Sequence, residues 1–354
     1  MKFTKEDTKI MKGAALCLML YHHLFAYPDK IREGIRFVSL CSFGGTTLST
    51  YIGQFGRICM PMFLFLSGYG TYLSSKKSEN VRAMSFQRIK GLYKQVWQVF
   101  FLSLPVSLWL NRVKGAALIK EAVLNGLTLA CSFNEEWWFI LPFAVLLVLF
   151  PVIKRCLDRQ NANLYTDFLF VLLYSAFYNY IVPGIFSAFP LAGFERSAVW
   201  HRMNEALSIF PAFFLGCVFA KYGILDRVKS DCAGKPGWCV LSLVCIGALF
   251  YLHLYNYMCY DFINCAVLIL CLTVLTPLRI LRWPFRFLSK LSEESTFMWL
   301  THTFFSSYWC QKLVFAPRYS LLIFAFLVAL SYAAAKFIRF FWKTASRLVK
   351  KEAD

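Results

Sequence analysis

The chain has 354 residues, of which 58% are hydrophobic and only 16% are charged, whereas soluble globular domains are about 45 to 50% apolar and about 25% charged. This composition excludes an ordinary soluble domain and indicates an all-α, polytopic membrane protein. The formal charge of +19 comes from an excess of Lys and Arg residues that lie between apolar runs. That placement is typical of membrane topology signals and argues against a nucleic-acid partner.

Apolar runs long enough to form helical spans alternate with charged or Pro- and Gly-containing stretches along the whole chain. They predict about ten transmembrane helices in a single domain over residues 1–354. In chain order, the runs cover residues 10–27, 54–74, 92–111, 137–153, 164–182, 205–221, 237–255, 258–277, 293–312 and 319–342. If the N-terminus lies inside, most Lys and Arg residues fall in inside segments, as the positive-inside rule requires. We therefore expect a multi-pass protein embedded in the lipid bilayer, with both termini in the cytoplasm.

The first run contains Lys12, His22 and His23 within an otherwise apolar stretch. Lys12 and His23 are about three helical turns apart, so their side chains differ by roughly 20° around the axis and by roughly 16 Å along it. Ionisable groups within a span usually face a cavity or the bundle interior, which favours a functional pair. The alternative is that both histidines are hydrogen-bonded near the outer interface. Because adjacent side chains on a helix point about 100° apart, His22 and His23 do not suit joint metal ligation, and no metal site is expected.

Two segments near the N-terminus carry a recognisable pattern. In the first, a basic residue is followed by ten residues and a histidine, which are Lys12 and His23. In the second, aromatic-rich residues lead into Ser67, Gly68 and Tyr69. These segments resemble the first two spans of the acyltransferase-3 family of integral-membrane acyltransferases, with Lys12 in place of the more usual Arg.

The polar loop after the second run gives a partial match to the same family. The family usually has two arginines three positions apart before its third span. Arg88 matches the first position, but Gly91 stands at the second. Lys90 or Lys94 could supply the missing charge, since a phosphate requires a cation but not necessarily a bidentate one.

Later runs add weaker candidates. Residues 136–140 and 298–302 are similar to two further family segments, and the second of them ends in His302. Asp261 and Asn264 lie three apart on one helical face and could orient His302 or an acceptor hydroxyl, or could form a structural contact. Glu135 and Glu136 fit a solvated helix N-terminus better than a general acid.

The resemblance implies acyl transfer from a thioester donor to a hydroxyl. A neutral imidazole is suited to take the hydroxyl proton, and cations are suited to bind the phosphates of a cytoplasmic acyl-CoA. The catalytic candidates are His23, His22, His302 and Asp261. The expected donor-binding residues are Lys12, Arg88, Lys90, Ser67 and Tyr69. Ser67 is disfavoured as a nucleophile, because a Ser-Gly pair also allows two helices to pack closely.

The predicted function is therefore membrane O-acylation, with a small acyl group such as acetyl moving from acyl-CoA to an envelope carbohydrate, a lipid-linked glycan or a similar acceptor. No tightly bound cofactor is expected, and acyl-CoA is a co-substrate. The alternatives are a secondary transporter with an intramembrane His and Asp relay, and a noncatalytic glycan exporter or scaffold. A secondary transporter is expected to contain an internal repeat, and this sequence shows none. Membrane-bound O-acyltransferases also use an intramembrane histidine, but theirs lies late in the chain, which favours the first-named family.

Overall fold

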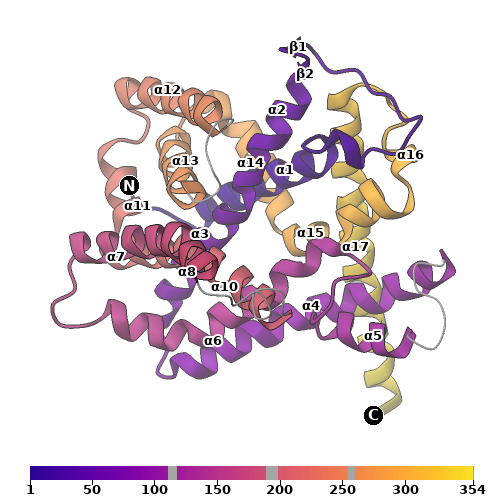
Figure 1. Cartoon of the computed structure of the whole chain (residues 1–354), viewed down its shortest axis with the longest axis horizontal. Helices are drawn as coiled ribbons and strands as arrows, with labels where there is room; N and C mark the ends of the chain where they lie inside the picture. Colours follow the sequence, from indigo (N-terminus) through magenta and orange to yellow (C-terminus); the bar gives the residue numbers. More distant parts are fainter. Residues whose placement is uncertain (111–117, 189–197, 254–259, 354) are drawn as a thin grey trace. The chain divides into compact units, whose positions relative to one another are not determined.

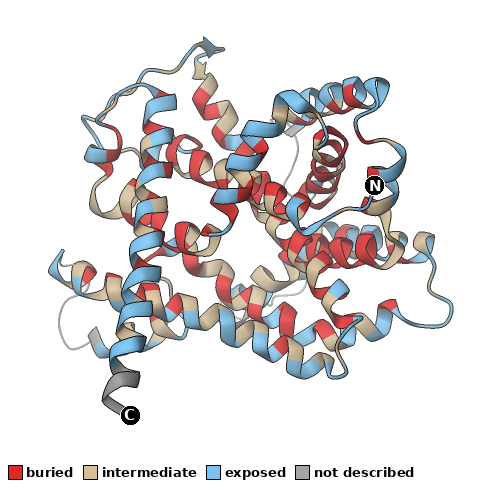
Figure 2. Ribbon diagram, turned by 180° about the vertical axis from the view of Figure 1, so that it is seen from behind, coloured by how far each residue is buried: buried red, intermediate tan, exposed pale blue. Residues whose placement is uncertain are grey.

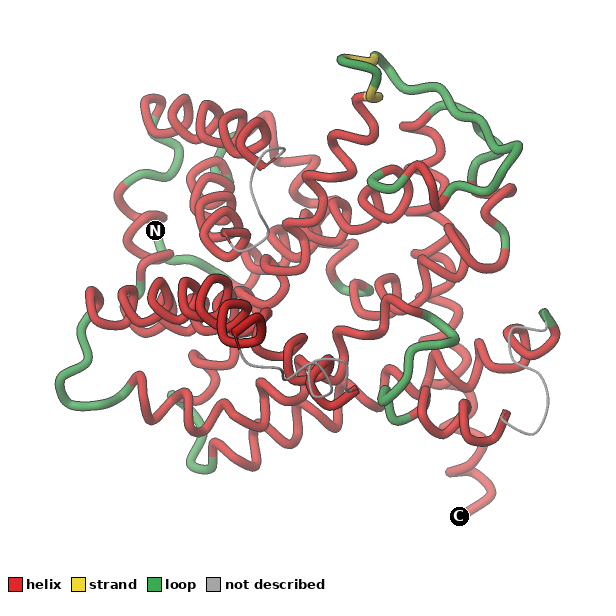
Figure 3. Tube along the Cα trace, viewed as in Figure 1, coloured by secondary structure: helices red, strands yellow, loops and turns green. Residues whose placement is uncertain are grey.

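The structure, a computed structural model, describes residues 1–110, 118–188, 198–253 and 260–353. Helices form nearly all of the regular structure in these residues (Figures 1 and 3). The exception is a hairpin of two short antiparallel strands, β1 (Ser42–Phe43) and β2 (Thr46–Thr47). Gly44 and Gly45 form its turn with positive φ values, which glycine adopts without steric cost. The all-α fold class predicted from composition is confirmed.

The chain divides into two compact units, each built from separate stretches of sequence. Unit 1 comprises Met1–Ala15, Ile58–Ile89 and Phe139–Ser289. It contains the start of α1 (Lys5–Phe25) and of α4 (Val81–Trp109), most of α14 (Arg282–Ser292), and the following complete helices. These are α3 (Cys59–Ser75), α6 (Ile140–Leu157), α7 (Leu164–Ala176), the π-helix η4 (Phe177–Ile181), α8 (Val182–Ala188), α10 (Ala198–Tyr222), α11 (Ile224–Asp231), α12 (Pro236–His253), α13 (Asp261–Leu275) and the 3-10 helix η6 (Arg279–Leu281).

Unit 2 comprises Leu16–Arg57, Lys90–Trp138 and Lys290–Asp354. It holds the ends of α1 and α4, and most of the 3-10 helix η3 (Glu135–Phe139). Its other helical elements are η1 (Pro28–Lys30), α2 (Leu48–Phe55), α5 (Leu118–Gly126), α15 (Ser295–Thr303), the π-helix η7 (Phe304–Trp309), α16 (Gln311–Val314) and α17 (Ser320–Ala353). The 3-10 segment η2 (Gly56–Ile58) lies at the boundary of the two units.

Four helical segments of the described chain are long and apolar enough to cross a membrane. They are Glu135–Leu157, Leu164–Ile185, Trp200–Tyr222 and Ser320–Leu348, and a fifth is obtained if α13 and α14 are taken as one bent span. Within the described residues, each apolar run predicted from the sequence falls on helical structure, and residues 111, 254, 255, 258 and 259 of these runs lie outside the described part. Several of these helices are short, such as α15 with 9 residues. The membrane character is therefore supported, whereas about ten spans, the single domain and the cytoplasmic termini stay predictions.

Within unit 1, α3 and α10 approach each other at two glycines. A Cβ atom on Gly68 would lie 2.0 Å from the carbonyl oxygen of Phe213, and one on Gly216 would lie 2.0 Å from that of Phe65. Any larger residue at either position would collide with backbone. In Figure 2, many helices carry both buried and exposed residues. In a membrane protein, the exposed apolar side chains of such helices are the ones available to lipid.

Candidate active site

His23 lies in the last turn of α1, together with His22. Its side chain is 16% exposed, and its Nδ1 atom lies 3.6 Å from Oε1 of Glu136. At this distance the contact is electrostatic, and the negative charge of the carboxylate favours the tautomer with the proton on the nearer ring nitrogen, Nδ1. The other ring nitrogen, Nε2, then carries the lone pair that a base needs.

A hydrogen bond from its backbone N–H holds Glu136 in place. Its N–H donates to Oδ1 of Asn134 at 3.1 Å, and the same oxygen accepts a hydrogen bond from the Thr303 hydroxyl at 3.0 Å. Asn134 and Thr303 are both fully or almost fully buried. These bonds fasten the start of η3 to the end of α15. Glu136 lies in the first turn of the helix η3, as expected, and its partly exposed carboxylate also faces a histidine. One feature of the sequence could have indicated this contact, because Glu136 begins a segment that is similar to one in the family.

His302 lies close to the same imidazole. Its ring centroid is 4.9 Å from that of His23, and its side chain is fully buried. Nδ1 of His302 donates to the backbone carbonyl of Trp299 at 2.7 Å, which leaves Nε2 as an acceptor. Nε2 has no hydrogen-bond partner within the described residues. We refer to His22, His23, His302 and Glu136 as the histidine–glutamate cluster.

His22 has a different environment from His23. Its Nδ1 atom lies 2.8 Å from the carbonyl oxygen of Gly53 in α2 and donates to it. Helix α2 lies very close to the end of α1 here. A Cβ atom on Gly53 would be only 2.6 Å from the backbone nitrogen of Ala26, the residue that follows α1. His22 also contacts the ring of Tyr27 edge to face, with centroids 5.3 Å apart. The structure thus gives His22 a clear role in joining α1 to α2.

Two of the expected donor-binding cations lie in unit 1. The guanidinium of Arg88 donates to the Ser74 hydroxyl at 2.8 Å and to the carbonyl of Gly70 at 3.3 Å. Lys12 is close enough to Arg88 for their charges to repel each other. No carboxylate pairs with either cation within the described residues. Two partly buried cations without a counter-ion form a region that attracts anions.

The other expected donor residues have simpler surroundings. Lys90 is exposed on α4. Tyr69 is 4% exposed and its ring contacts Phe3 edge to face, with centroids 5.6 Å apart. Ser67 is half-buried and precedes Gly68, the residue at which α3 approaches α10. The position of Gly68 supports the packing interpretation of the Ser-Gly pair.

Asp261 and Asn264 lie in the first turn of α13, in unit 1, and both are buried. Nδ2 of Asn264 has no partner within the part of the chain that the structure describes. The predicted orientation of His302 by Asp261 stays a prediction. The contact found at Nδ1 of His302 is the Trp299 carbonyl.

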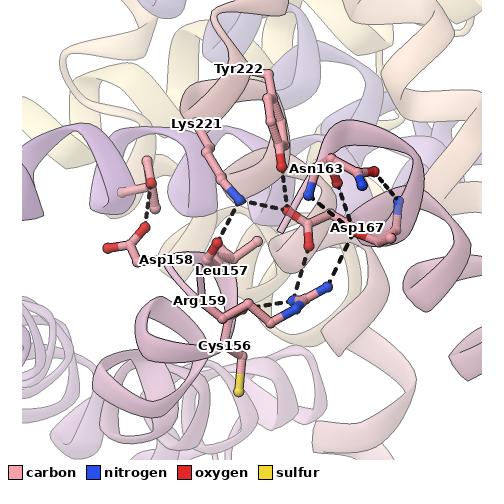
Figure 4. A network of polar contacts seen from close by, with 10 residues as sticks. Cys156, Leu157, Asp158, Arg159, Asn163, Asp167, Lys221 and Tyr222 are labelled. Atoms are coloured by element: carbon pink, nitrogen blue, oxygen red, sulfur yellow. Dashed lines mark hydrogen bonds and ion pairs between the residues drawn. The ribbon is translucent and has the colours of Figure 1, made fainter. Parts of the chain in front are cut away.

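A second polar network in unit 1 was not anticipated from the sequence (Figure 4). Asp167 is fully buried and accepts from Tyr222 at 2.8 Å and from Lys221 at 2.9 Å, while Arg159 pairs with its other oxygen at 3.1 Å. The loop after α6 is thereby joined to α7 and α10. Neighbouring Asp158 bonds to Tyr72 and Lys154. Partial burial raises the pKa of Asp158, but these hydrogen bonds lower it more, so the pKa lies below its ordinary value.

Metal binding receives no support from the described residues. Among them, no group of three or more His, Cys, Asp and Glu side chains has an arrangement that could hold a metal ion. The histidine–glutamate cluster instead offers a base and a carboxylate beside it. Such a pair is suited to proton transfer at a hydroxyl.

Comparison with known proteins gives one match. The family model described as an acyltransferase domain, that of the acyltransferase-3 family, matches residues 8–338. No curated protein and no solved structure matches the chain. The family match covers Lys12, His23, Glu136 and His302, and so includes both the predicted pattern and the observed cluster.

Proposed function

The chain belongs to the acyltransferase-3 family and is a membrane acyltransferase, and from this premise we propose that it moves a small acyl group, such as acetyl, from cytoplasmic acyl-CoA to a hydroxyl. The acceptor in this proposal is an envelope carbohydrate, a lipid-linked glycan or a similar hydroxyl compound. The protein acts in a bacterial-type plasma membrane. The observation that carries the proposal is the 3.6 Å approach of Glu136 Oε1 to His23 Nδ1.

In the proposed reaction, Nε2 of His23 takes the proton from the acceptor hydroxyl. The hydroxyl oxygen attacks the thioester carbonyl carbon, and a new C–O ester bond replaces the broken C–S bond. The CoA sulfur leaves as a thiolate and receives the proton from the imidazolium. Glu136 stabilises the imidazolium in between, because opposite charges at this distance attract in a partly desolvated site. No covalent enzyme intermediate is needed, so Ser67 has no chemical role.

Two buried polar atoms near the base support the proposal. Nδ2 of Asn134 is a donor and Nε2 of His302 is an acceptor, and neither has a partner within the described residues. Buried polar groups are normally hydrogen-bonded, so these two atoms are suited to substrate groups. The thioester carbonyl can accept from an amide, and a second hydroxyl of a carbohydrate acceptor can donate to an imidazole. We assign Asn134 to the carbonyl oxygen and His302 to a hydroxyl next to the reacting one.

The donor is proposed to bind through its phosphates. Lys12 and Arg88 supply positive charge without a carboxylate partner among the described residues, and Arg88 is held by Ser74 and Gly70. Charge-assisted hydrogen bonds from such cations to phosphate are about twice as strong as neutral ones. Lys90 is exposed and can contribute further charge.

The proposal is tested by transfer of radiolabelled acetyl from acetyl-CoA into the glycan fraction of membranes that contain the protein. His23→Ala is compared with wild type at matched expression. The control is His201→Ala, which removes a histidine whose side chain is 68% exposed. Label incorporated by wild type and by the control, but lost in His23→Ala, is the expected result.

Equal label in wild type and His23→Ala would overturn the role of His23 as the base. An absence of label with several acyl-CoA donors, in membranes where the protein is folded, would remove acyl-CoA as the donor. Such a result would shift the interpretation toward the transporter or exporter alternatives.

A further inference from the structure

Helix α14 differs from the apolar helices of unit 1 in direction and in composition. It follows α13 after a short break, and the two axes are bent by 109°. Helix α13 coincides with one of the predicted spans. A helix almost perpendicular to a span runs near the plane of the membrane. The α14 sequence contains Arg282, Arg286 and Lys290 within 11 residues, which is unsuited to the bilayer core.

One face of α14 is buried within unit 1. Phe285 packs in a cluster with Ile10, Val274 and Leu275. Leu288, one turn further along, comes so close to α1 that a Cβ atom on Gly13 would lie 2.0 Å from its carbonyl oxygen. This packing fixes the rotation of α14 about its axis. The opposite face is therefore held outward.

The outward face combines cations with aromatic rings. Arg282 and Arg286 are four residues apart and form one stripe, while Trp283 and Phe287 form the next stripe, about 100° around the axis. The Trp283 and Phe287 rings are stacked with centroids 6.2 Å apart, and Trp283 is 77% exposed. Just before the helix, Arg279 adds a further exposed cation.

Among the residues that the structure describes, these cations have no acidic partner. Within the described chain, no ion pair or side-chain hydrogen bond involves Arg279, Arg282 or Arg286. A row of unpaired cations beside exposed Trp and Phe rings has the chemistry of an interfacial membrane helix, in which the rings enter the headgroup region and the cations bind phosphate. A second copy of a chain with net charge +19 would bring like charge to this face, which disfavours self-association there.

We propose that the exposed face of α14 binds anionic phospholipid headgroups of the membrane leaflet on which it lies. Arg279, Arg282 and Arg286 would contact the phosphates. Trp283 and Phe287 would insert beside the glycerol backbone. This interaction is separate from the acyl-transfer chemistry, and it holds whether or not His23 is the base.

The test uses the full-length protein in detergent and measures lipid retention by native mass spectrometry. The probes are phosphatidylglycerol and phosphatidylcholine with identical acyl chains. The variant carries Arg279→Gln, Arg282→Gln and Arg286→Gln. The matched control carries Lys77→Gln, Arg82→Gln and Arg155→Gln, which removes the same charge from three exposed positions of unit 1.

Wild type and the control should retain phosphatidylglycerol in preference to phosphatidylcholine. The α14 variant should lose at least about fivefold in phosphatidylglycerol retention, since each cation near an anionic surface contributes on that order. No preference in wild type, an undiminished preference in the α14 variant, or an equal loss in the control would each overturn the proposal.

A second measurement does not require the triple variant to fold. Brominated lipids quench nearby tryptophan fluorescence, and comparing wild type with Trp283→Phe isolates one of the ten tryptophans. Brominated phosphatidylglycerol should quench wild type more than brominated phosphatidylcholine does, and Trp283→Phe should lose this difference. Equal quenching of wild type by the two lipids would also overturn the proposal.

Discussion

Oε1 of Glu136 lies 3.6 Å from Nδ1 of His23, and the backbone of Glu136 is held by Asn134. The two residues are far apart in the sequence and come from different helical segments. A carboxylate beside an imidazole sets its tautomer and stabilises its protonated form. The roles of Glu136, Asn134 and His22 can be tested separately, because each substitution has a distinct expected effect.

Glu136→Gln should lower kcat for acetyl transfer by roughly tenfold or more, with little change in KM for the donor. The amide keeps the size of the side chain but removes the charge that stabilises the imidazolium in the transition state. Steady-state kinetics of purified protein in lipid nanodiscs measures both constants. Glu135→Gln, at an exposed neighbouring position, is the control and should match wild type. An unchanged kcat in Glu136→Gln would contradict this role for the carboxylate.

Asn134→Asp separates two roles of one side chain. Aspartate keeps the oxygen that accepts from the Glu136 N–H and from Thr303, but it lacks the amide donor assigned to the thioester carbonyl. We expect kcat to fall by about 100-fold, the usual effect of losing one oxyanion donor. Asn134 is fully buried, so a charged aspartate would also lower the stability, and the melting temperature is measured beside kcat to separate the two effects. Retained kcat would show that the carbonyl oxygen is stabilised by another group.

His22→Leu should destabilise the protein by about 1–3 kcal/mol, because the buried carbonyl of Gly53 loses its donor. His22→Asn places an amide donor near the position of Nδ1 and should restore most of the stability. Melting temperatures in detergent, followed by the intrinsic fluorescence of the protein, compare the two variants. Equal melting temperatures for wild type and His22→Leu would mean that the hydrogen bond contributes nothing.

Lys12→Gln and Arg88→Gln should each raise KM for acetyl-CoA by roughly tenfold, with a smaller effect on kcat, since a charge-assisted contact to phosphate is lost. Acetyl-pantetheine lacks these phosphates, so with this donor the variants should resemble wild type. Arg82→Gln, an exposed residue of the same helix as Arg88, serves as the control. A comparable penalty with acetyl-pantetheine would place the two cations elsewhere in the reaction.

Gly68→Ala and Gly216→Ala should destabilise the protein by at least about 1–3 kcal/mol, because each new methyl group would collide with a backbone carbonyl of the facing helix. Gly70→Ala adds the same methyl group where no atom lies within 4 Å and should be well tolerated. Size-exclusion profiles and melting temperatures distinguish the three variants. A stable Gly68→Ala protein would show that α3 and α10 can separate at little cost.

The all-α membrane fold could be predicted because hydropathy and helical length are local properties of the sequence. The placement of Lys12 and His23 in one helix was equally accessible, because the apolar run that contains them is continuous, and both residues lie in α1. The number of spans is harder to predict from the sequence than the fold class. Helices such as α15, which continues into the π-helix η7, are too short to be identified as spans from composition alone.

The sequence predicted only part of the candidate site. The family pattern pointed to His23, and residues 298–302 pointed to His302. The sequence predicts Glu136 at a helix start, where the structure has it, but nothing around it shows that this glutamate faces an imidazole. The different surroundings of His22 and His23 were also hidden, since adjacent residues on a helix point in different directions and their partners come from other segments.

The sequence by itself therefore determined that the chain is a helical membrane protein, which family it resembles, and which histidine of the first run matches the family. Only the tertiary structure decided that Glu136 faces His23, that His22 bonds to Gly53, and that α14 turns away from α13 with its cations outward. The physical reason is that the first set depends on the order of residues along one helix. The second set depends on which distant segments pack together, because hydrogen bonds and close glycine contacts form only after the helices have assembled.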